Sequence, residues 1–115
     1  GKRLGSSIGI PTVNLTVPPH VLTPAHGVYA TRVQIGEASY MGVTNVGVRP
    51  TVDRSTHVTV ETFILDFSSD LYGQTLRVDF YKRLRAERKF ASLDELKTQI
   101  QRDMDSTRSF FQKHP

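Results

Sequence analysis

The sequence changes from a two-residue period to a helical period near residue 92, and this change limits the possible folds more than any other feature. Four segments alternate in hydrophobicity and are rich in β-branched residues, as half-buried strands are. They span residues 27–35, 38–46, 57–67 and 75–81. After them, the apolar residues spaced as one helical face are Leu93, Leu96, Ile100, Met104 and Phe111. The pattern predicts several antiparallel strands followed by one helix over about residues 92–112.

A capping box predicts where this helix begins. In the segment Ser92-Leu93-Asp94-Glu95, the serine hydroxyl can accept a hydrogen bond from the backbone N–H of Glu95, whose side chain reaches back. Asp94 and Glu95 also suit the positive end of a helix dipole. We expect the helix to pack on the strands and to do no chemistry.

Length and composition predict one small all-β domain with this terminal helix. The 115 residues suffice for a single domain, and short strands joined by Gly- and Pro-containing loops favour a barrel or a sandwich. Residues 47–55 have the composition of such a loop. No apolar run is long enough to span a membrane, no signal peptide is visible, and the absence of cysteine fits a cytoplasmic location.

The charge is basic and locally concentrated. Fifteen Lys and Arg against eleven Asp and Glu give a formal net charge of +4, and the pI is near 9.7. A pI above about 9 is one footprint of a nucleic-acid-binding domain. The concentrated stretch consists of Lys82, Arg83, Arg85, Arg88 and Lys89. It indicates either a solvated face with one local anion site or a surface that binds nucleic acid.

Residues near the N-terminus form the first candidate site. The glycine-rich stretch over residues 1–9 matches neither the G-x-x-x-x-G-K-[ST] nor the G-x-G-x-x-G phosphate-binding pattern. Thr12 and Asn14 follow it, and in an extended segment they project to the same side. Their neutral oxygens suit a Mg²⁺ ion that arrives with nucleotide phosphates, although both residue types are also common at strand ends and turns.

Glu61 is the second candidate, as a general base. In an extended segment it shares its side with Phe63, Leu65 and Phe67, and burial among them would raise its pKa toward a useful range. The alternative is a carboxylate at the solvent-exposed end of that side.

The basic cluster is the third candidate. Arg85 offers a planar guanidinium that can grip a phosphate or stack on a flat ring, and Phe90 could supply a ring platform. An aromatic residue before a capping box can equally be a core residue or a hydrophobic staple. The four histidines have no metal-ligand spacing: His20, His26, His57 and His114.

Several motifs, in order along nearly the whole chain, resemble those of riboflavin kinases. Residues 9–15 (GIPTVNL) are similar to the family signature G-[FI]-P-T-A-N-[LI], and residues 45–51 (NVGVRPT) match N-[IV]-G-x-R-P-T. Residues 60–62 (VET) match V-E-[TS]. Further matching segments are residues 27–30, 64–67, 70–73, 84–85 and 89–90, followed by the Ser92 helix. The R-P-T and L-D-F versions resemble the bacterial kinases, which are usually the C-terminal module of a bifunctional FAD synthase.

The resemblance implies a six-stranded antiparallel Greek-key barrel with a C-terminal helix, formed by one domain over residues 1–115. It implies phosphate transfer from ATP to the 5′-hydroxyl of riboflavin, giving FMN and ADP, with an adenylyltransferase domain preceding the kinase in the parent chain. Glu61 would be the catalytic base, and Thr12 and Asn14 would hold Mg²⁺ with the nucleotide phosphates. The residues implied for substrates are Gly5, Ser6, Gly9, Ile64, Asp66 and Tyr72 for ATP, and Arg85, Arg88 and Phe90 for the flavin. Asp66 is expected on the same strand as Glu61 but on its other face.

Two departures from the family pattern bear on the fold. Val13 replaces the family's alanine and could crowd the core. Gly1 falls inside or just after the family's first strand, so the barrel could have an unpaired edge.

Two other functions stay open: a non-catalytic flavin- or nucleotide-binding barrel, and a basic barrel that binds nucleic acid. The latter should interleave exposed aromatic and basic residues along adjacent strands. The strand aromatics Phe63, Phe67 and Phe80 instead follow the alternation of core positions. This pattern favours the kinase, with riboflavin and ATP as partners and with neither nucleic acid nor a membrane.

Overall fold

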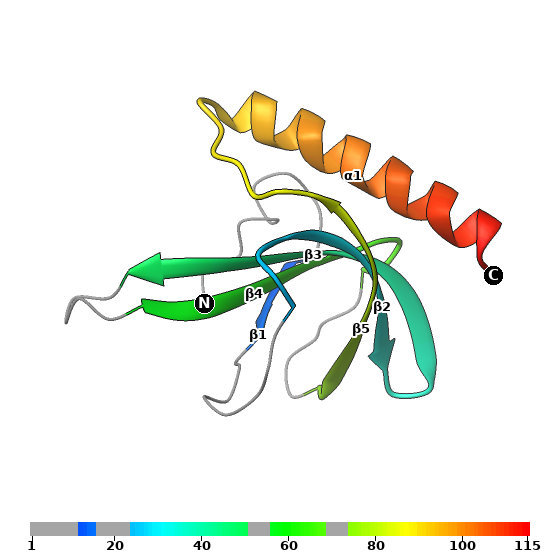
Figure 1. The fold of residues 1–115 in the computed structure, drawn as a ribbon. Helices are drawn as coiled ribbons and strands as arrows, with labels where there is room; N and C mark the ends of the chain where they lie inside the picture. The colour runs from blue at the N-terminus through cyan, green and yellow to red at the C-terminus, as the bar shows by residue number, and fades with distance from the viewer. Residues whose placement is uncertain (1–11, 16–23, 51–55, 69–73) are drawn as a thin grey trace.

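The computed structural model describes residues 12–15, 24–50, 56–68 and 74–115, which form one antiparallel sheet and one helix (Figure 1). The strands are β1 (Thr12–Leu15), β2 (Gly27–Ile35), β3 (Ala38–Pro50), β4 (Thr56–Ile64) and β5 (Leu76–Arg85), and the helix is α1 (Leu93–Lys113). Within these ranges no helix combines the length and the apolar character needed to cross a membrane.

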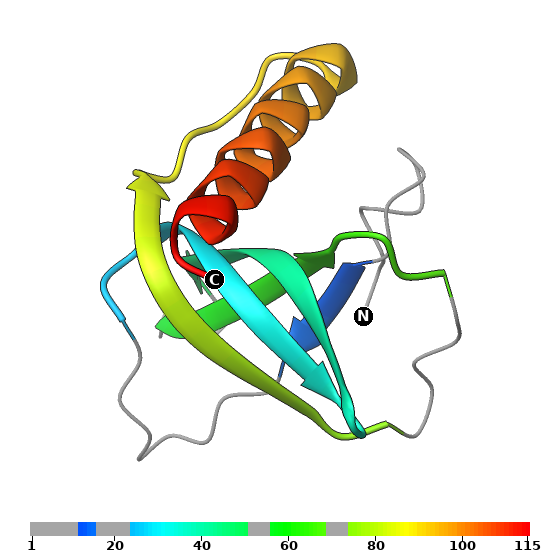
Figure 2. The same cartoon turned by 90° about the vertical axis from the view of Figure 1, so that its right-hand side faces the viewer.

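The sheet has the strand order β1-β4-β3-β2-β5, and every neighbouring pair is antiparallel. Strands β2, β3 and β4 are consecutive neighbours, whereas β5 returns to lie on the other side of β2, which is a Greek key. Figure 2 shows β5 curving along the sheet beside β2. The antiparallel Greek-key architecture with a C-terminal helix, implied by the resemblance, is therefore confirmed.

The strand count differs from the expected six. The described residues form five strands, and no pairing joins β1 to β5 among them. The additional strand was expected at the N-terminus, and residues 1–11 lie outside the described part of the chain.

The β2–β3 hairpin forms where it was predicted. Its two-residue turn is Gly36-Glu37, closed by the pair of Ile35 and Ala38. Gly36 has a φ of 59°, a left-handed conformation that glycine adopts without steric cost and that two-residue hairpins favour.

β3 is longer than predicted, because it continues through residues predicted as a loop. Gly47 pairs with Thr59 of β4, and Val48 pairs with Val58. These ladder contacts outweigh the low strand preference of glycine, and β3 ends only at Pro50.

The other two strands differ from the prediction at their C-terminal ends. β4 ends at Ile64 instead of Phe67, since Asp66 adopts a left-handed φ of 56°, which aspartate tolerates better than most residues. β5 continues to Arg85 instead of Tyr81, because its pairing with β2 extends that far.

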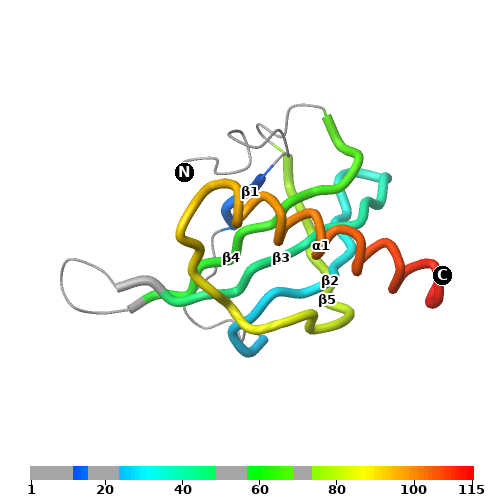
Figure 3. Tube along the Cα trace, turned by 90° about the horizontal axis from the view of Figure 1, so that it is seen from above, coloured from blue at the N-terminus to red at the C-terminus, as the bar shows by residue number. Residues whose placement is uncertain are grey.

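Helix α1 begins at its predicted capping box. Ser92 Oγ accepts a hydrogen bond from Glu95 N at 3.2 Å, and the Glu95 carboxylate reaches back to the backbone N–H of Ala91 at 2.9 Å. Ile100 and Met104 are buried against the sheet, over which α1 runs (Figure 3). Leu93 is 50% exposed, because the first turn extends beyond the contact between helix and sheet.

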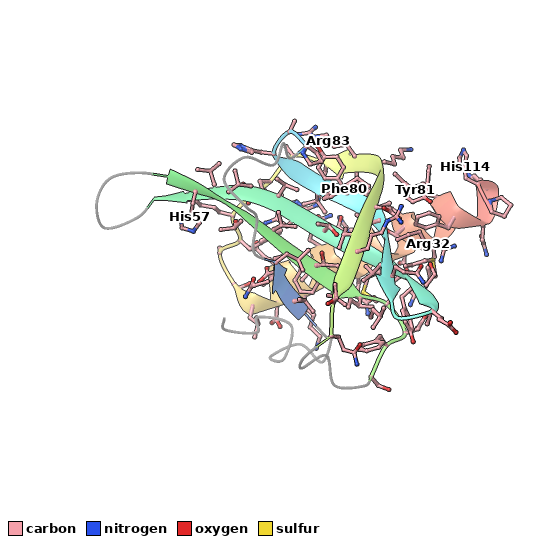
Figure 4. The ribbon with its side chains drawn as sticks, turned by 90° about the horizontal axis from the view of Figure 1, so that it is seen from below. Arg32, His57, Phe80, Tyr81, Arg83 and His114 are labelled. Carbon is pink, nitrogen blue, oxygen red and sulfur yellow. The ribbon has the colours of Figure 1, made fainter. Side chains whose placement is uncertain are left out.

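The sheet divides the core into two layers. Between the sheet and α1, the packed residues are Val28, Val43, Phe63, Leu65, Ile100 and Met104. On the other face, seen in Figure 4, Tyr29, Val46 and Val60 pack with the half-buried Leu15, Val58 and Phe80. Each fully buried large apolar side chain contributes about 1.5–3 kcal/mol. Apolar side chains thus pack on both faces of the sheet, and the helix-facing side also supports the candidate site.

Candidate active site

The five strands place five side chains in one row across the helix-facing side of the sheet. Direct partners in the register are, from one edge to the other, Asn14, Glu61, Asn45, Val28 and Arg85. Opposite residues of antiparallel strands project to the same face, about 5 Å apart from strand to strand. Residues far apart in the sequence are therefore neighbours, and Glu61 lies between two carboxamides.

A cavity of about 460 Å³ lies over this row and is lined by residues of the sheet, of the first half of α1 and of the linker 86–92. Figure 1 shows how this linker joins β5 to α1. The sheet contributes Val28, Val43, Asn45, Glu61 and Phe63, the linker contributes Glu87, Arg88 and Phe90, and α1 contributes Leu96, Ile100 and Asp103. A cavity of this volume, lined by apolar residues and a few polar groups, is typical of sites for small molecules.

Glu61 is half-buried in this cavity. The next two residues on its side, Phe63 and Leu65, belong to the core beneath α1, so the predicted apolar neighbours are confirmed for these two. Phe67 lies beyond the end of β4 and packs edge-on against Tyr40 instead. A carboxylate at the edge of an apolar surface can accept a proton from a hydroxyl held in the cavity.

Thr12 and Asn14 lie on the same side of β1, as predicted. Thr12 is buried opposite Phe63, and Asn14 is exposed opposite Glu61. Hydroxyl and carboxamide oxygens are hard neutral donors, so this donor set fits a Mg²⁺ ion that carries nucleotide phosphates. Among the described residues, no group of three or more His, Cys, Asp or Glu side chains could hold a metal ion.

Two arginines face Phe90 at the other end of the cavity. The guanidinium carbon of Arg88 lies 4.8 Å from the ring centroid of Phe90, and that of Arg85 lies 5.9 Å from it. Both distances are within the range of cation–π attraction. The three residues predicted for the flavin therefore lie together, and Phe90 lines the cavity instead of joining either core layer.

Glu87 and its binding partners on β3 were not among the predicted site residues. Asn45 Nδ2 donates a hydrogen bond to Glu87 Oε2 at 3.1 Å. A Cβ atom on Gly47 would lie 2.8 Å from Glu87 Cδ, so any larger residue at this position would displace the Glu87 carboxylate. The available signal was the spacing of Asn45 and Gly47, which places both on one side of a strand. We call Asn45 and Gly47 the Glu87 seat.

Helix α1 adds two polar residues that the apolar periodicity does not reveal. Asp103 is 3% exposed and accepts hydrogen bonds from Arg85 Nε at 3.0 Å and from Arg85 Nη2 at 2.7 Å. Gln99, one turn earlier, donates to Asp103 at 3.0 Å and accepts from Arg88 at 3.1 Å. The helix therefore bonds to the site residues in addition to packing on the sheet. The available signal was an aspartate within the buried face of α1, next to Met104.

The remaining predicted residues are not brought to this cavity. Ile64 is fully buried on the opposite face of β4 from Glu61. Asp66 lies past the end of β4, so the prediction that it shares the strand of Glu61 is wrong, and its carboxylate lies 3.4 Å from Arg108 Nη2 of α1. The predicted residues that lie outside the described ranges are Gly5, Ser6, Gly9 and Tyr72.

The charges around the cavity are mixed. Its lining contains the carboxylates of Glu61, Glu87 and Asp103 and the guanidinium groups of Arg85 and Arg88. A polyanion would meet more negative than positive groups here, whereas an uncharged ring system with hydroxyls would not be repelled. The cavity therefore suits an uncharged polar aromatic molecule better than it suits nucleic acid.

Comparison with known proteins gives one consistent family. Residues 1–111 match the Flavokinase family, described as riboflavin kinase. The chain is 46% identical over 112 residues to the bifunctional riboflavin kinase/FMN adenylyltransferase of Escherichia coli (strain K12), covering 96% of this chain and 35% of that protein. The Haemophilus influenzae protein of the same name is 39% identical over 96% of this chain and 36% of its own length. The chain thus spans about a third of these relatives.

A solved structure from Streptococcus pneumoniae, named as a macrolide-efflux protein, has the same fold. Its TM-score is 0.86 and its sequence identity is 37%, over 94% of this chain and 35% of that chain. The match therefore covers nearly all of the present fold and about a third of the other protein.

Proposed function

The chain belongs to the Flavokinase (riboflavin kinase) family, and from this premise we propose that it transfers the γ-phosphate of ATP to the 5′-hydroxyl of riboflavin, giving FMN and ADP. The observation that carries the proposal is the row across the sheet. It places Glu61 at one end of the cavity and Arg85, beside Phe90, at the other, three strand spacings of about 4.8 Å away. A substrate with a flat ring system at one end and a hydroxyl at the other fits this arrangement.

In the proposed reaction, Glu61 accepts the proton of the 5′-hydroxyl of riboflavin. The oxygen of that hydroxyl attacks the γ-phosphorus of ATP at the same time. The bond between that phosphorus and the bridging oxygen breaks, and ADP leaves with the electron pair. The flavin ring lies against Phe90 and beside the two guanidinium groups, which orients the hydroxyl toward Glu61. Phosphoryl transfer depends mainly on such positioning.

The nucleotide is the second substrate of the proposal. Thr12 and Asn14 would hold Mg²⁺ together with the ATP phosphates, and the ion would neutralise phosphate charge. The assignments of Gly5, Ser6, Gly9, Ile64, Asp66 and Tyr72 to ATP stay predictions. Of these residues, Ile64 and Asp66 do not line the cavity that contains Glu61.

The parent protein is part of the same proposal. Because the named relatives are bifunctional and about three times as long, we infer that an FMN adenylyltransferase domain precedes this chain in its parent. A single domain over residues 1–115 and a cytoplasmic location stay predictions from the sequence.

The proposal is tested by incubating the purified protein with riboflavin, ATP and Mg²⁺ and separating the flavins by chromatography with fluorescence detection. We expect FMN only when all three components are present, and no FMN after Mg²⁺ is removed with a chelator. Riboflavin binding without FMN would favour the non-catalytic flavin-binding barrel. A folded protein that does not bind riboflavin would contradict the proposal and would favour the nucleic-acid-binding alternative.

A further inference from the structure

Arg85 is held by a carboxylate on the helix. Its Nε and Nη2 atoms bond to the two oxygens of Asp103, and the side chains of Arg85 and Asp103 are only 21% and 5% exposed. Two parallel bonds between a guanidinium and a carboxylate fix the plane of the arginine as well as its position. The buried carboxylate also offsets the charge of Arg85 inside the cavity wall.

Arg88 is held by the same helix through a neutral group. Its Nη1 donates to Gln99 Oε1, and the amide nitrogen of Gln99 donates to Asp103 Oδ1. Gln99 and Asp103 are four residues apart and therefore lie on one face of α1. The hydrogen bonds form a continuous chain from Arg88 through Gln99 and Asp103 to Arg85.

Phe90 lies beside the two ends of this chain, within 4.8 Å of the Arg88 guanidinium carbon and 5.9 Å of that of Arg85. Free arginine side chains have many rotamers, and losing that freedom on binding weakens affinity. The hydrogen bonds to α1 restrict this freedom before a ligand arrives, most strongly for the half-buried Arg85. The helix thus preorganises one end of the cavity.

We propose that Gln99 and Asp103 are positioning residues for the flavin ring: they hold Arg88 and Arg85 beside Phe90 so that the ring binds to a preformed surface. This inference rests on the proposed function. In addition to packing on the sheet, α1 would thus orient two arginines of the flavin site. The inference predicts that changes in Gln99 and Asp103 affect the binding of riboflavin and leave that of ATP unchanged.

The test compares steady-state kinetics of the purified protein with those of Asp103→Asn and Gln99→Met. Asp103→Asn keeps the size of the side chain but removes the charge that faces Arg85, and we expect the KM for riboflavin to rise about tenfold or more. Gln99→Met keeps the length but neither hydrogen bond, and we expect a rise of about three- to fivefold. In both variants the KM for ATP should stay within about twofold, and kcat should change less than the KM for riboflavin.

The matched control is Asp105→Asn, the same chemical change on the same helix. The Asp105 side chain is 78% exposed and lies 3.9 Å from Arg108. The KM of the Asp105→Asn variant for riboflavin should therefore equal that of the original protein. A purely structural role of Asp103 would lower the melting temperature and the active fraction, and hence kcat, without raising the KM for riboflavin.

Each result decides a separate question. A protein that makes no FMN before any substitution contradicts the proposed function itself. An active protein whose two variants keep the original KM for riboflavin contradicts only the positioning role. If Asp103→Asn does not fold, because Arg85 is left without its carboxylate, Gln99→Met decides alone: an unchanged riboflavin KM overturns the proposal.

Discussion

On the side of the sheet turned away from α1, buried hydroxyls bond to one another. Thr31, Thr44 and Thr62 lie on three adjacent strands, are fully buried, and are linked by oxygen–oxygen distances of 2.9 Å. On the helix-facing side, the same strands carry Asn45, and the return strand β5 carries Arg85. Their partners come from outside the sheet: Glu87 of the linker bonds to Asn45, and Asp103 of α1 bonds to Arg85.

This difference separates what stabilises the sheet from what forms the cavity. The three threonines, which we call the threonine ladder, satisfy one another and leave nothing for a ligand to reach. The helix-facing groups depend on the linker and on α1, which stand away from the sheet far enough to leave a cavity of about 460 Å³. Substitutions on one side should therefore change stability, and those on the other side should change kinetics.

The largest expected effect is that of Glu61→Gln on catalysis. Replacing the proposed base with an amide should lower kcat about 10²–10⁴-fold, while riboflavin and ATP still bind and the melting temperature hardly changes. Flavin chromatography measures the rate, and equilibrium titration of riboflavin fluorescence measures binding. Glu37→Gln, in the exposed β2–β3 turn, is the matched control and should keep full activity. A Glu61→Gln variant with near-normal kcat would remove Glu61 as the base.

The next effect is on stability, from Thr44→Val in the middle of the threonine ladder. Without the Thr44 hydroxyl, the buried hydroxyls of Thr31 and Thr62 each lose a hydrogen-bond partner. The free energy of unfolding should therefore fall by about 1–3 kcal/mol. Urea denaturation measures the loss, and kcat/KM should stay within about twofold.

Thr107→Val is the control for the ladder. Thr107 is also fully buried, but its hydroxyl has no hydrogen-bond partner among the described residues, so its removal should cost little or stabilise. Equal losses in Thr44→Val and Thr107→Val would show that the ladder bonds add nothing.

A smaller effect is expected for Asn14→Ala, measured by Mg²⁺ titration of FMN formation. Loss of one neutral oxygen ligand should raise the Mg²⁺ requirement about tenfold, equivalent to about 1.4 kcal/mol. Val13→Ala is the control, because Val13 pairs with Thr62 and projects to the other side of β1. If both variants titrate like the original protein, Asn14 does not bind the ion.

The smallest effect should come from Gly47→Ala, which displaces the Glu87 carboxylate from the Glu87 seat. We expect the KM for riboflavin to rise about threefold, because Gly47 and Glu87 are in contact. A change of this size agrees with the interaction free energies usual between residues in contact. The effect should vanish when Glu87 is already alanine, which a double-mutant cycle measures. Additive effects would show that Gly47 acts without Glu87.

Local patterns in the sequence predicted much of the fold. Alternation located the β2–β3 hairpin, and the capping box located the start of α1 within one residue. They failed at the ends of β3 and β4, where pairing partners and one left-handed residue, Asp66, decide the boundary. Such contacts depend on the register between strands, which local propensity does not contain.

The candidate site was predicted only in part, for the same reason. Alternation predicted that Thr12 and Asn14 share one side of their strand, and the structure confirms this; the register further places Glu61 on the same face. Asp103 and Glu87 could not be found in this way, because each bonds to a residue 18 or more positions away in the sequence. Charged residues on an otherwise ordinary helix or linker reveal their partners only after the chain has folded.

The most direct test of the central claim, that the helix-facing cavity is a riboflavin kinase site with Glu61 as its base, follows a labelled phosphate. The purified protein and Glu61→Gln are each incubated with riboflavin, Mg²⁺ and ATP labelled in the γ-phosphate, and the products are separated. We predict that the label appears in FMN, one phosphate for each riboflavin consumed, and that Glu61→Gln transfers almost none. Label released as inorganic phosphate with riboflavin unchanged, or equal transfer by both proteins, would contradict the account.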